Sequence, residues 1–465
     1  MECKSLYIKT FGCQMNERDS EIIAHLLSSL GYVCTDDWEE ADLVVLNTCS
    51  IRDKAEQKVY SYLGQIRAKR PANGPMIVVA GCVAQQQGKE IFRRMPHVDI
   101  VVGTQQLYNL PAMVLEVEGK KISRYLADKL ETNFTIPTYK QIFAPQSSAM
   151  AGNDPSALPS STSLHKKFVT IMQGCNNYCS YCVVPYTRGR ETSREISDIL
   201  DEVRSLVRQG VREITLLGQN VNSYGKTLKS GNRNPTFAQL LYQVAEVKGL
   251  TRLRFTTSNP HDLSDDLIDC FRNIDKLCSH FHLPVQSGSD AVLAKMRRRY
   301  TVSEYLDRVD RLREARPGIA ISTDIIVGFP GESDEDFEAT MQLLETVRFH
   351  ASFSFKYSDR PGTLSASFDN KVEEKIKSER LSRFQQRQDE ITFKHNNSYL
   401  GKEIEIMLEE SGPRSFGRTG TNHLVHLEEN LDPSCYAAGD CLTARITRAG
   451  KHSLTGTTTS PDKAM

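Results

Sequence analysis

The chain has 465 residues, 39% of them hydrophobic and 25% charged, and its 58 basic residues balance 58 acidic ones. This length predicts two or three domains, and the zero net charge excludes a global field that would attract nucleic acid, so any RNA contact has to be local. No apolar run approaches the ~20 residues of a membrane span and the N-terminus shows no export leader, so twelve cysteines indicate thiolate chemistry in a reducing cytoplasm rather than disulfides.

The first 120 residues alternate short apolar runs with helical stretches. Near-continuous apolar runs are typical of parallel strands that are buried on both faces. The order of strands and helices predicts a doubly wound parallel α/β domain over residues 1–120. The expected strands are Tyr7–Thr10, Leu43–Leu46, Ile77–Ala80 and Ile100–Val102, and the expected helices include Asp19–Leu30 and Lys54–Lys69.

Three of these strands are each followed by a cysteine just before the next helix, namely Cys13, Cys49 and Cys82. The carboxyl ends of parallel strands share one edge of a sheet, and that edge is where open α/β folds bind ligands. A single free cysteine is most often a small buried hydrophobic residue. Because all three fall at the same edge, we expect them to form one three-thiolate site for a metal cluster.

Residues 121–163 are expected to form a linker. The stretch from Asp128 to Ser163 is polar and rich in proline and serine, a composition that does not pack a core. We therefore expect the next domain to begin near residue 164.

The segment after the linker places Cys175, Cys179 and Cys182 in one short loop, directly after an apolar run. A [4Fe-4S] cluster takes four thiolates, so a loop with three leaves one iron free to bind another ligand. The alternative is a structural zinc site, which closes its shell with four cysteine or histidine ligands. The nearest downstream histidine, His261, is far away in the sequence, so the spacing favours iron and sulfur.

Strand and helix patterns alternate again over residues 164–396. Thr192 to Glu195 fit a helix capping box, and the apolar face that follows ends at Gly210. About six strand-and-helix units predict a partial (β/α)6 barrel whose active face is the carboxyl edge of its strands. The expected strands after the cysteine loop are Glu213–Leu217, Leu253–Phe255, Phe281–Leu283, Ile319–Val327 and Phe353–Phe355.

The C-terminal part changes character after a charged helix expected over residues 372–396. Short strands with glycine or proline turns are expected at Glu403–Leu408, Arg418–Leu427 and Cys441–Thr447. They predict a small all-β barrel over residues 397–462, so the fold class of the chain is α/β with a C-terminal β barrel.

The Cys-x3-Cys-x2-Cys loop resembles the signature of radical S-adenosylmethionine (SAM) enzymes, and the whole chain resembles their methylthiotransferase family. The likeness implies a radical SAM core between an N-terminal cluster-binding domain and a C-terminal TRAM domain. It favours the branch that modifies an isopentenylated adenine of tRNA. The strings that carry it are Cys13-Gln-Met-Asn16, Asn47-Thr-Cys-Ser-Ile-Arg52, Leu217-Gly-Gln-Asn-Val-Asn222, Phe255-Thr-Thr-Ser258 and Leu283-Pro-Val-Gln-Ser-Gly-Ser-Asp290.

The resemblance also implies the chemistry, because an aromatic C–H bond needs a cofactor rather than an acid or base. One SAM would supply a methyl group, and another a 5′-deoxyadenosyl radical that takes the hydrogen from C2 of isopentenyladenosine beside the tRNA anticodon. An electron donor and a sulfur source are implied as partners, and a monomer is expected. Two [4Fe-4S] clusters are implied, one on Cys175, Cys179 and Cys182 that binds SAM, and an auxiliary one on Cys13, Cys49 and Cys82.

Four residues at strand ends are further candidates. Gly328 and Glu332 resemble the superfamily's segment near the SAM adenine, and the alternative is a tight strand-to-helix turn with Ser333 or Glu332 as its cap. Gln219 is a candidate cofactor ligand and Asn220 a candidate substrate ligand at the end of a barrel strand. Satisfied loop hydrogen bonds are the alternative for both.

Four arginines are candidate substrate ligands. Arg188 and Arg190 follow the cysteine loop, where a guanidinium group could hold RNA phosphate or the SAM carboxylate. Arg297 and Arg298 belong to the basic run Lys295–Arg299. A solvated charged surface is the alternative in both places.

Two kinds of alternative function stay open at this point. The same chemistry could act on threonylcarbamoyl-adenosine in tRNA or on a ribosomal protein aspartate. A non-catalytic iron–sulfur protein that binds RNA is the other alternative, and reductive cleavage of SAM would exclude it.

Overall fold

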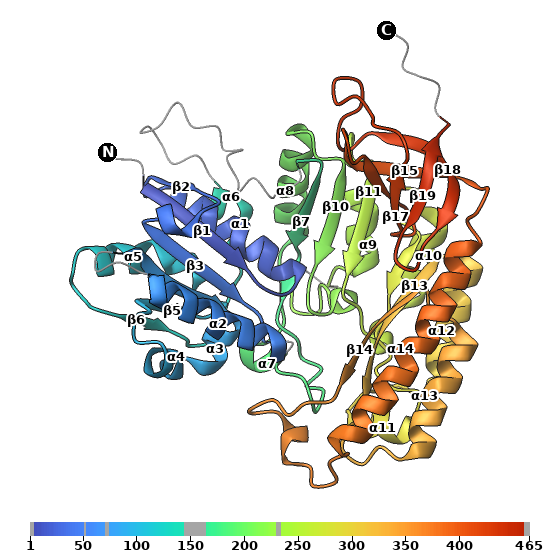
Figure 1. Cartoon of the computed structure of the whole chain (residues 1–465), viewed down its shortest axis with the longest axis horizontal. Coiled ribbons are helices and arrows are strands. Elements are labelled where there is room, and N and C mark those ends of the chain that lie inside the picture. Colours follow the sequence, from blue (N-terminus) through green and yellow to red (C-terminus); the bar gives the residue numbers. More distant parts are fainter. Residues whose placement is uncertain (1–3, 51–52, 70–73, 144–163, 229–233, 460–465) are drawn as a thin grey trace. The chain divides into compact units, whose positions relative to one another are not determined.

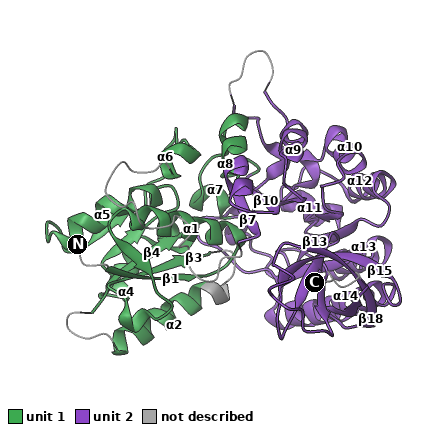
Figure 2. Cartoon of the chain, turned by 90° about the horizontal axis from the view of Figure 1, so that it is seen from above, with its two compact units in different colours: residues 1–162, 170–177, 183–202 green, residues 163–169, 178–182, 203–465 purple. Residues whose placement is uncertain are grey.

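The computed structural model describes residues 4–50, 53–69, 74–143, 164–228 and 234–459. The chain divides into two compact units (Figure 2). The first combines residues 1–162, 170–177 and 183–202, and the second combines residues 163–169, 178–182 and 203–465. The proline- and serine-rich part of the expected linker, residues 145–162, lies outside the described residues.

A six-stranded parallel sheet forms the centre of the first unit (Figure 1). Its strands lie in the order β2-β1-β3-β4-β5-β6, so β1 pairs with β3 although β2 separates them in the sequence. Ligands bind at such a point of reversal in open α/β sheets. The strands are β1 Lys4–Thr10, β2 Tyr32–Cys34, β3 Leu43–Thr48, β4 Met76–Gly81, β5 Ile100–Val102 and β6 Tyr125–Ala127.

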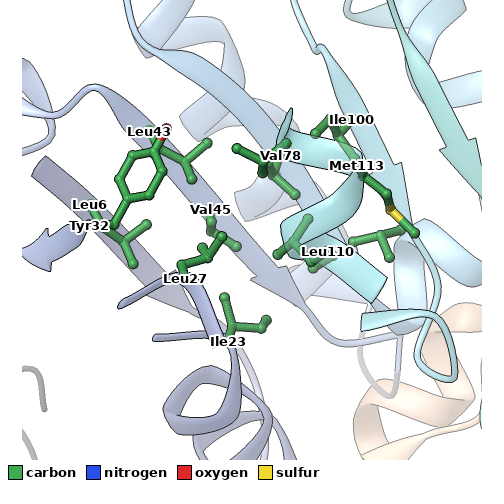
Figure 3. Packing of buried hydrophobic residues seen from close by; sticks show 13 residues of the cluster. Leu6, Ile23, Leu27, Tyr32, Leu43, Val45, Val78, Ile100, Leu110 and Met113 are labelled. Atoms are coloured by element: carbon green, nitrogen blue, oxygen red, sulfur yellow. The ribbon is translucent and has the colours of Figure 1, made fainter. Parts of the chain in front are cut away.

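Helices cover both faces of this sheet because successive side chains of each strand point to opposite faces. On one face Val45 and Val78 pack against Ile23 and Leu110 (Figure 3). The alternate residues of the same strands form a second core, and each fully buried aliphatic side chain contributes about 1.5–3 kcal/mol. The doubly wound prediction is therefore confirmed. The helices are α1 Gln14–Ser28, α2 Asp53–Lys69, α3 Cys82–Gln87, α4 Lys89–Arg94, α5 Leu110–Glu118 and α6 Tyr139–Phe143.

Two details of the first unit differ from expectation. Helix α1 begins at Gln14 rather than at Asp19, so Cys13 occupies its N-cap position. Strand β6 pairs with β5 and lies inside the range 121–163 that was expected to be linker.

The first unit also takes in two segments, residues 170–177 and 183–202, that flank Cys179 and Cys182 of the cysteine loop. It contains β8 Met172–Gln173, α7 Val184–Thr187 and β9 Thr192–Ser193. The predicted capping box at Thr192 is wrong, because Thr192 pairs with Gln173 and its hydroxyl donates to the Phe134 carbonyl. Helix α8 Ile196–Arg208 follows and ends before Gly210, which takes a positive φ of 98° as predicted for a helix end.

The second unit is built on an open barrel of parallel strands. Two three-stranded sheets, β11-β10-β7 and β12-β13-β14, are joined by a parallel bridge between Leu253 and Leu277. The six strands confirm the partial barrel. They are β7 Lys166–Thr170, β10 Glu213–Leu217, β11 Arg252–Thr256, β12 His280–His282, β13 Ala320–Val327 and β14 Ala351–Lys356.

Helices pack on this open barrel through aromatic contacts. Phe255 and Phe281 of the strands meet Phe271 of α10 edge to face, with ring centroids 5.3–5.9 Å apart. None of the described helices is long and apolar enough to cross a membrane. The helices of this unit after α8 are α9 Phe237–Ala245, α10 Asp265–Asn273, α11 Asp290–Lys295, α12 Val302–Ala315, α13 Asp334–Val347 and α14 Glu374–Asn397.

A closed five-stranded barrel ends the chain and confirms the predicted all-β region. The single strand expected at Arg418–Leu427 is wrong: the segment is a hairpin that turns at Asn422, where φ is 72°. Arg252 of the open barrel donates to the Arg418 carbonyl at 2.5 Å and so ties the two barrels together. The strands are β15 Glu403–Glu410, β16 Phe416–Thr419, β17 Leu424–Leu427, β18 Cys441–Ala449 and β19 Leu454–Thr458.

Candidate functional site

Cys13, Cys49 and Cys82 lie at the carboxyl edge of the first unit's sheet, as predicted. They follow β1, β3 and β4, so the first two flank the reversal of strand order. Cys49 and Cys82 are buried, and Cys13 is half-buried. At Gly12, where φ is 109°, a Cβ atom would lie 2.7 Å from Cys49 Sγ, so only glycine lets the chain pass this close to the thiol.

The three thiols also interact electrostatically. A hydrogen bond with Cys49 lowers the pKa of Cys13 to about 6, with burial acting in the opposite direction and the positive charge of Arg188 helping. Burial raises the pKa of Cys82, and the same arginine opposes that rise. Cys13 is therefore a thiolate near neutral pH, the form that binds metal.

Arg188 supplies positive charge to this cysteine set from within the first unit. Its side chain is 3% exposed, and Nη2 lies 2.7 Å from Asp19 Oδ2 and 2.9 Å from Asn16 Oδ1. Arg188 was expected to contact RNA phosphate or SAM. The structure instead buries it beside Cys13 and Cys82.

Unsatisfied polar atoms accompany the three thiols. Arg188 Nη1, Ser50 Oγ and Asn47 Oδ1 are buried without a hydrogen-bond partner among the described residues. Across the same residues, no three His, Cys, Asp or Glu side chains converge on one point as a single metal ion requires. A [4Fe-4S] cluster makes a different demand, because each thiolate binds a different iron and the sulfide atoms accept hydrogen bonds. Three thiolates with the buried donors of Arg188 and Ser50 beside them are compatible with such a cluster.

The second cysteine set lies in the loop between β8 and α7. Gly174 has a φ of 82°, and a Cβ there would lie 2.2 Å from the Arg190 carbonyl, so glycine is required where the loop begins. Cys175 belongs to the first unit, where its N–H donates to the Gly189 carbonyl at 3.3 Å. Cys179 and Cys182 belong to the second, where the Cys182 N–H donates to the Cys179 carbonyl at 3.1 Å.

Arg298 reaches a sulfur of this second set. Its Nη1 donates to Cys179 Sγ at 3.4 Å, and its Nη2 donates to the Pro284 carbonyl at 2.9 Å. The guanidinium group also contacts Tyr300 through a hydrogen bond and the face of the ring. Arg298 was expected in an exposed basic patch, but its guanidinium is directed to Cys179.

The turn after β13 contains Gly328 and Glu332. The buried Glu332 carboxylate accepts the Gly328 N–H at 2.9 Å and pairs with Arg380 of α14 at 2.7 Å. Burial nevertheless raises the pKa of Glu332. Ser333, not Glu332, caps α13. The Glu332 side chain thus fixes the turn, and the backbone of the turn is left as the candidate SAM contact.

Gln219 and Asn220 follow β10. Gln219 is half-buried. Asn220 is 2% exposed, donates to Asp262 Oδ2 at 2.6 Å and accepts the Asn259 N–H at 3.1 Å. Both ends of the Asn220 amide are engaged by the neighbouring loop, which agrees with the alternative of a satisfied loop hydrogen bond.

Three basic residues near the cysteine loop and α11 remain exposed, namely Arg190, Arg297 and Arg299. Arg297 takes a positive φ of 57° just after α11, which turns the chain so that Arg298 points inward. Lys295 is engaged by the Gly331 carbonyl at 2.8 Å. The predicted basic run is therefore divided between an inward arginine and two outward ones.

The contacts of Asp19 and Asn16 with Arg188 were not predicted from the sequence, although Asn16 belongs to the string Cys13-Gln-Met-Asn16. Both residues lie on the first turns of α1 and orient Arg188 toward the cysteines. For Asp19 the signal in the sequence was the charged run Glu17-Arg18-Asp19 close after Cys13, a pattern that is also typical of a solvated helix face.

Two family models match the chain. Residues 5–103 match the uncharacterized protein family UPF0004, and residues 169–344 match the radical SAM superfamily. The first match covers Cys13, Cys49 and Cys82, and the second covers the cysteine loop.

Relatives with assigned names match the chain over nearly its whole length. A protein of Desulfotalea psychrophila is 54% identical over 462 residues, which cover 98% of this chain and 99% of that one. A protein of Geobacter sulfurreducens is 46% identical over 460 residues, covering 98% and 97%. Both are named tRNA-2-methylthio-N(6)-dimethylallyladenosine synthase.

Among solved structures, the chain is similar to the radical SAM methyltransferase TsrM from Kitasatospora setae, determined with cobalamin and a [4Fe-4S] cluster bound. The TM-score is 0.57 at 14% identity, covering 79% of this chain and 77% of that one. This likeness concerns the fold alone.

Proposed function

This chain belongs to the tRNA-2-methylthio-N(6)-dimethylallyladenosine synthases, a family of radical SAM tRNA methylthiotransferases, and from that membership we propose the roles of its residues. The reaction is the methylthiolation at C2 of N6-isopentenyladenosine in tRNA. The cofactors of the radical SAM superfamily are a [4Fe-4S] cluster and SAM. What this chain must supply is the geometry that brings them to the adenine.

Cys175, Cys179 and Cys182 hold the cluster that binds SAM in this proposal. Three thiolates leave one iron for the amino and carboxylate groups of SAM. When bound, SAM supplies both a 5′-deoxyadenosyl radical and, from a second molecule, the methyl group. The backbone of the turn at Gly328, fixed by Glu332, and the half-buried Gln219 are the proposed SAM contacts.

Cys13, Cys49 and Cys82 hold an auxiliary [4Fe-4S] cluster. The single observation that carries this role is that the three thiols share one sheet edge with Arg188 and with buried polar atoms that lack partners. The auxiliary cluster is the proposed place where the transferred sulfur is held.

The tRNA partner is proposed to bind through exposed basic side chains. Arg190 and Arg297 present their charge to solvent, as phosphate contacts require. Asn220 positions the loop after β10 rather than binding the base directly. An electron donor and a sulfur source complete the partners, the chain acts as a monomer, and the proposed compartment is the cytoplasm, where thiolates stay reduced.

The proposed division of labour follows the expected domains. Residues 1–120 hold the auxiliary cluster, residues 121–163 link, residues 164–396 form the radical SAM core, and residues 397–462 form the TRAM domain. Strand β6 and residues 170–177 and 183–202 complete the first compact unit.

The test compares two cysteine variants after anaerobic reconstitution. Cys13→Ala is expected to lose at least ~10-fold of the 2-methylthio product while still cleaving SAM to 5′-deoxyadenosine, because only the auxiliary set is broken. Cys179→Ala is expected to lose both the 2-methylthio product and the cleavage of SAM. Mass spectrometry of digested tRNA and of small-molecule products measures the two activities.

Cys34→Ala is the matched control, because Cys34 ends β2 in the same sheet but belongs to neither set. It is expected to keep wild-type product and about eight irons per chain. Methylthiolated tRNA formed by Cys13→Ala at the wild-type rate would contradict the proposed auxiliary site.

A further inference from the structure

Among the described residues, the buried Nη1 donor of Arg188 has no hydrogen-bond partner. A buried guanidinium group is costly unless its charge and its five N–H donors are satisfied. Asp19 and Asn16 engage Nη2, but Nη1 is buried and has no hydrogen-bond partner among the described residues. An additional acceptor beside Nη1 would complete the site.

The surroundings of Arg188 identify the class of that acceptor. Asn16 Oδ1 lies 2.9 Å from Arg188 Nη2 and 3.8 Å from Cys13 Sγ, so the guanidinium group lies beside the cysteine set. A [4Fe-4S] cluster held by three thiolates is anionic, and its sulfur atoms accept hydrogen bonds from charged donors.

The position of Arg188 is fixed from both sides. Its N–H closes the short helix α7 by donating to the Val184 carbonyl at 2.8 Å. The preceding carbonyl, that of Thr187, accepts the Thr104 hydroxyl at 2.5 Å. Asp19 then orients the guanidinium plane, so the free donor points in a set direction.

We propose that Arg188 is a positioning residue for the auxiliary cluster, donating from Nη1 to one of its sulfur atoms and offsetting its negative charge. This inference rests on the proposed function, specifically on a cluster held by Cys13, Cys49 and Cys82. Hydrogen bonds to sulfur and local charge set the reduction potential of such clusters. Arg188 therefore raises the potential of the auxiliary cluster.

Arg298 provides an internal comparison. It donates to Cys179 Sγ at 3.4 Å in the second unit, so each cysteine set has its own arginine. The two arginines should act separately, Arg188 on the auxiliary cluster and Arg298 on the SAM cluster.

The experiment uses the full chain with Cys175, Cys179 and Cys182 replaced by alanine, so that only the auxiliary cluster is loaded. Iron content and the midpoint potential, followed by electron paramagnetic resonance, are measured after anaerobic reconstitution. Arg188→Gln is expected to shift the midpoint potential to a more negative value, and Arg188→Lys to shift it less. Arg67→Gln, an exposed arginine on α2 of the same unit, is the matched control and should leave the potential unchanged.

Arg188→Gln alone would leave the buried Asp19 carboxylate without its ion-pair partner, and a second variant avoids this destabilisation. Asp19→Asn combined with Arg188→Gln deletes both buried charges at nearly constant volume, and it too should lower the potential or the iron content. A loaded cluster at the wild-type potential in this double variant overturns the proposal. The proposal is also overturned if Arg298→Gln shifts the midpoint potential of the auxiliary cluster as much as Arg188→Gln does.

Melting of the iron-free chains separates a merely structural role. A lower melting temperature of the iron-free double variant together with an unchanged potential would assign Arg188 to folding alone and overturn the inference. If the parent chain with three alanines holds no iron at all, the auxiliary site itself fails, and the role of Arg188 falls with it.

Discussion

Four histidines of the second unit, His280, His350, His395 and His423, lie close together. The rings of His350 and His395 stack with centroids 4.1 Å apart, and His423 lies 6.1 Å from His350. Burial lowers the pKa of His350 to about 3, with His395, His423 and Arg313 adding to the effect. Burial likewise lowers the pKa of His423 to about 4 and that of His280 well below its ordinary value. These rings are neutral in the folded chain at pH 7.

Acid should therefore destabilise the second unit through His350. His350 has a lower pKa in the folded chain than in the unfolded chain, so acid protonates the unfolded chain first and favours unfolding. The contribution of this ring to the free energy of unfolding is therefore fully present above pH ~6.5. It falls by about 1.4 kcal/mol per pH unit as the pH drops toward 3. Between pH 7 and pH 5, the free energy of unfolding of His350→Gln is expected to fall by about 2 kcal/mol less than that of the wild type. Urea unfolding of the iron-free protein at both pH values measures this difference.

His452→Gln is the control for this experiment, because the ring is exposed in the folded chain. An equal loss of stability in His350→Gln and the wild type would show that another group carries the acid response.

Among the helices, two that begin at serine offer a matched pair. Ser333 accepts the Asp336 N–H and forms a capping box at the start of α13, whereas Ser264 at the start of α10 makes no capping bond. A lost cap costs about 1 kcal/mol. Ser333→Ala should therefore lower the free energy of unfolding by about 1 kcal/mol and Ser264→Ala by a few tenths, both measured by urea unfolding.

Equal effects of the two serine substitutions would contradict the capping geometry. Because Ser333 follows Glu332 directly, the comparison also reports how firmly the turn at Gly328 is held.

Most elements could be predicted because local pattern and tertiary role agree. The buried runs around Val45 and Val78 have no reading other than parallel strands. The exceptions are short or polar: β6 has three residues, and β19 contains one strongly apolar side chain, Leu454, among threonines and a glycine. Thr192 carried a helix-start signal but formed a hairpin with β8, since strand pairing outweighed a local cap.

At the scale of the whole molecule, the cysteines of the candidate site could be predicted from the sequence, but the contacts between distant residues could not. The six cysteines could be found because each follows a strand or lies in a short motif. The partner of Arg188 could not, because Asn16 lies 172 residues away in the sequence and only folding brings it near. The inward position of Arg298 could not be predicted either, because Arg298 belongs to a basic run whose pattern is typical of a solvated surface.

Removal of iron should destabilise the whole chain. A cluster that binds only the folded protein adds stability by mass action, and without it the buried Arg188 donor loses its partner. We expect chelation to lower the melting temperature by several degrees, measured by circular dichroism under anaerobic conditions. A variant with Cys13, Cys49 and Cys82 replaced by alanine should show a smaller difference between its iron-loaded and iron-free forms; an equal difference would contradict an auxiliary cluster.

The first unit is not contiguous, and this has a consequence for synthesis on the ribosome. Arg18 and Asp19 near the start of the chain are buried against Glu202 and Arg188, with side chains 6% and 5% exposed. A nascent chain that has emerged only as far as β6 leaves Arg18 with Glu21 of its own helix as its ion-pair partner and Asp19 without Arg188. The first unit can therefore complete its fold only after translation has passed α8. Until then it has no complete cluster-binding site for the cellular machinery that delivers iron and sulfur.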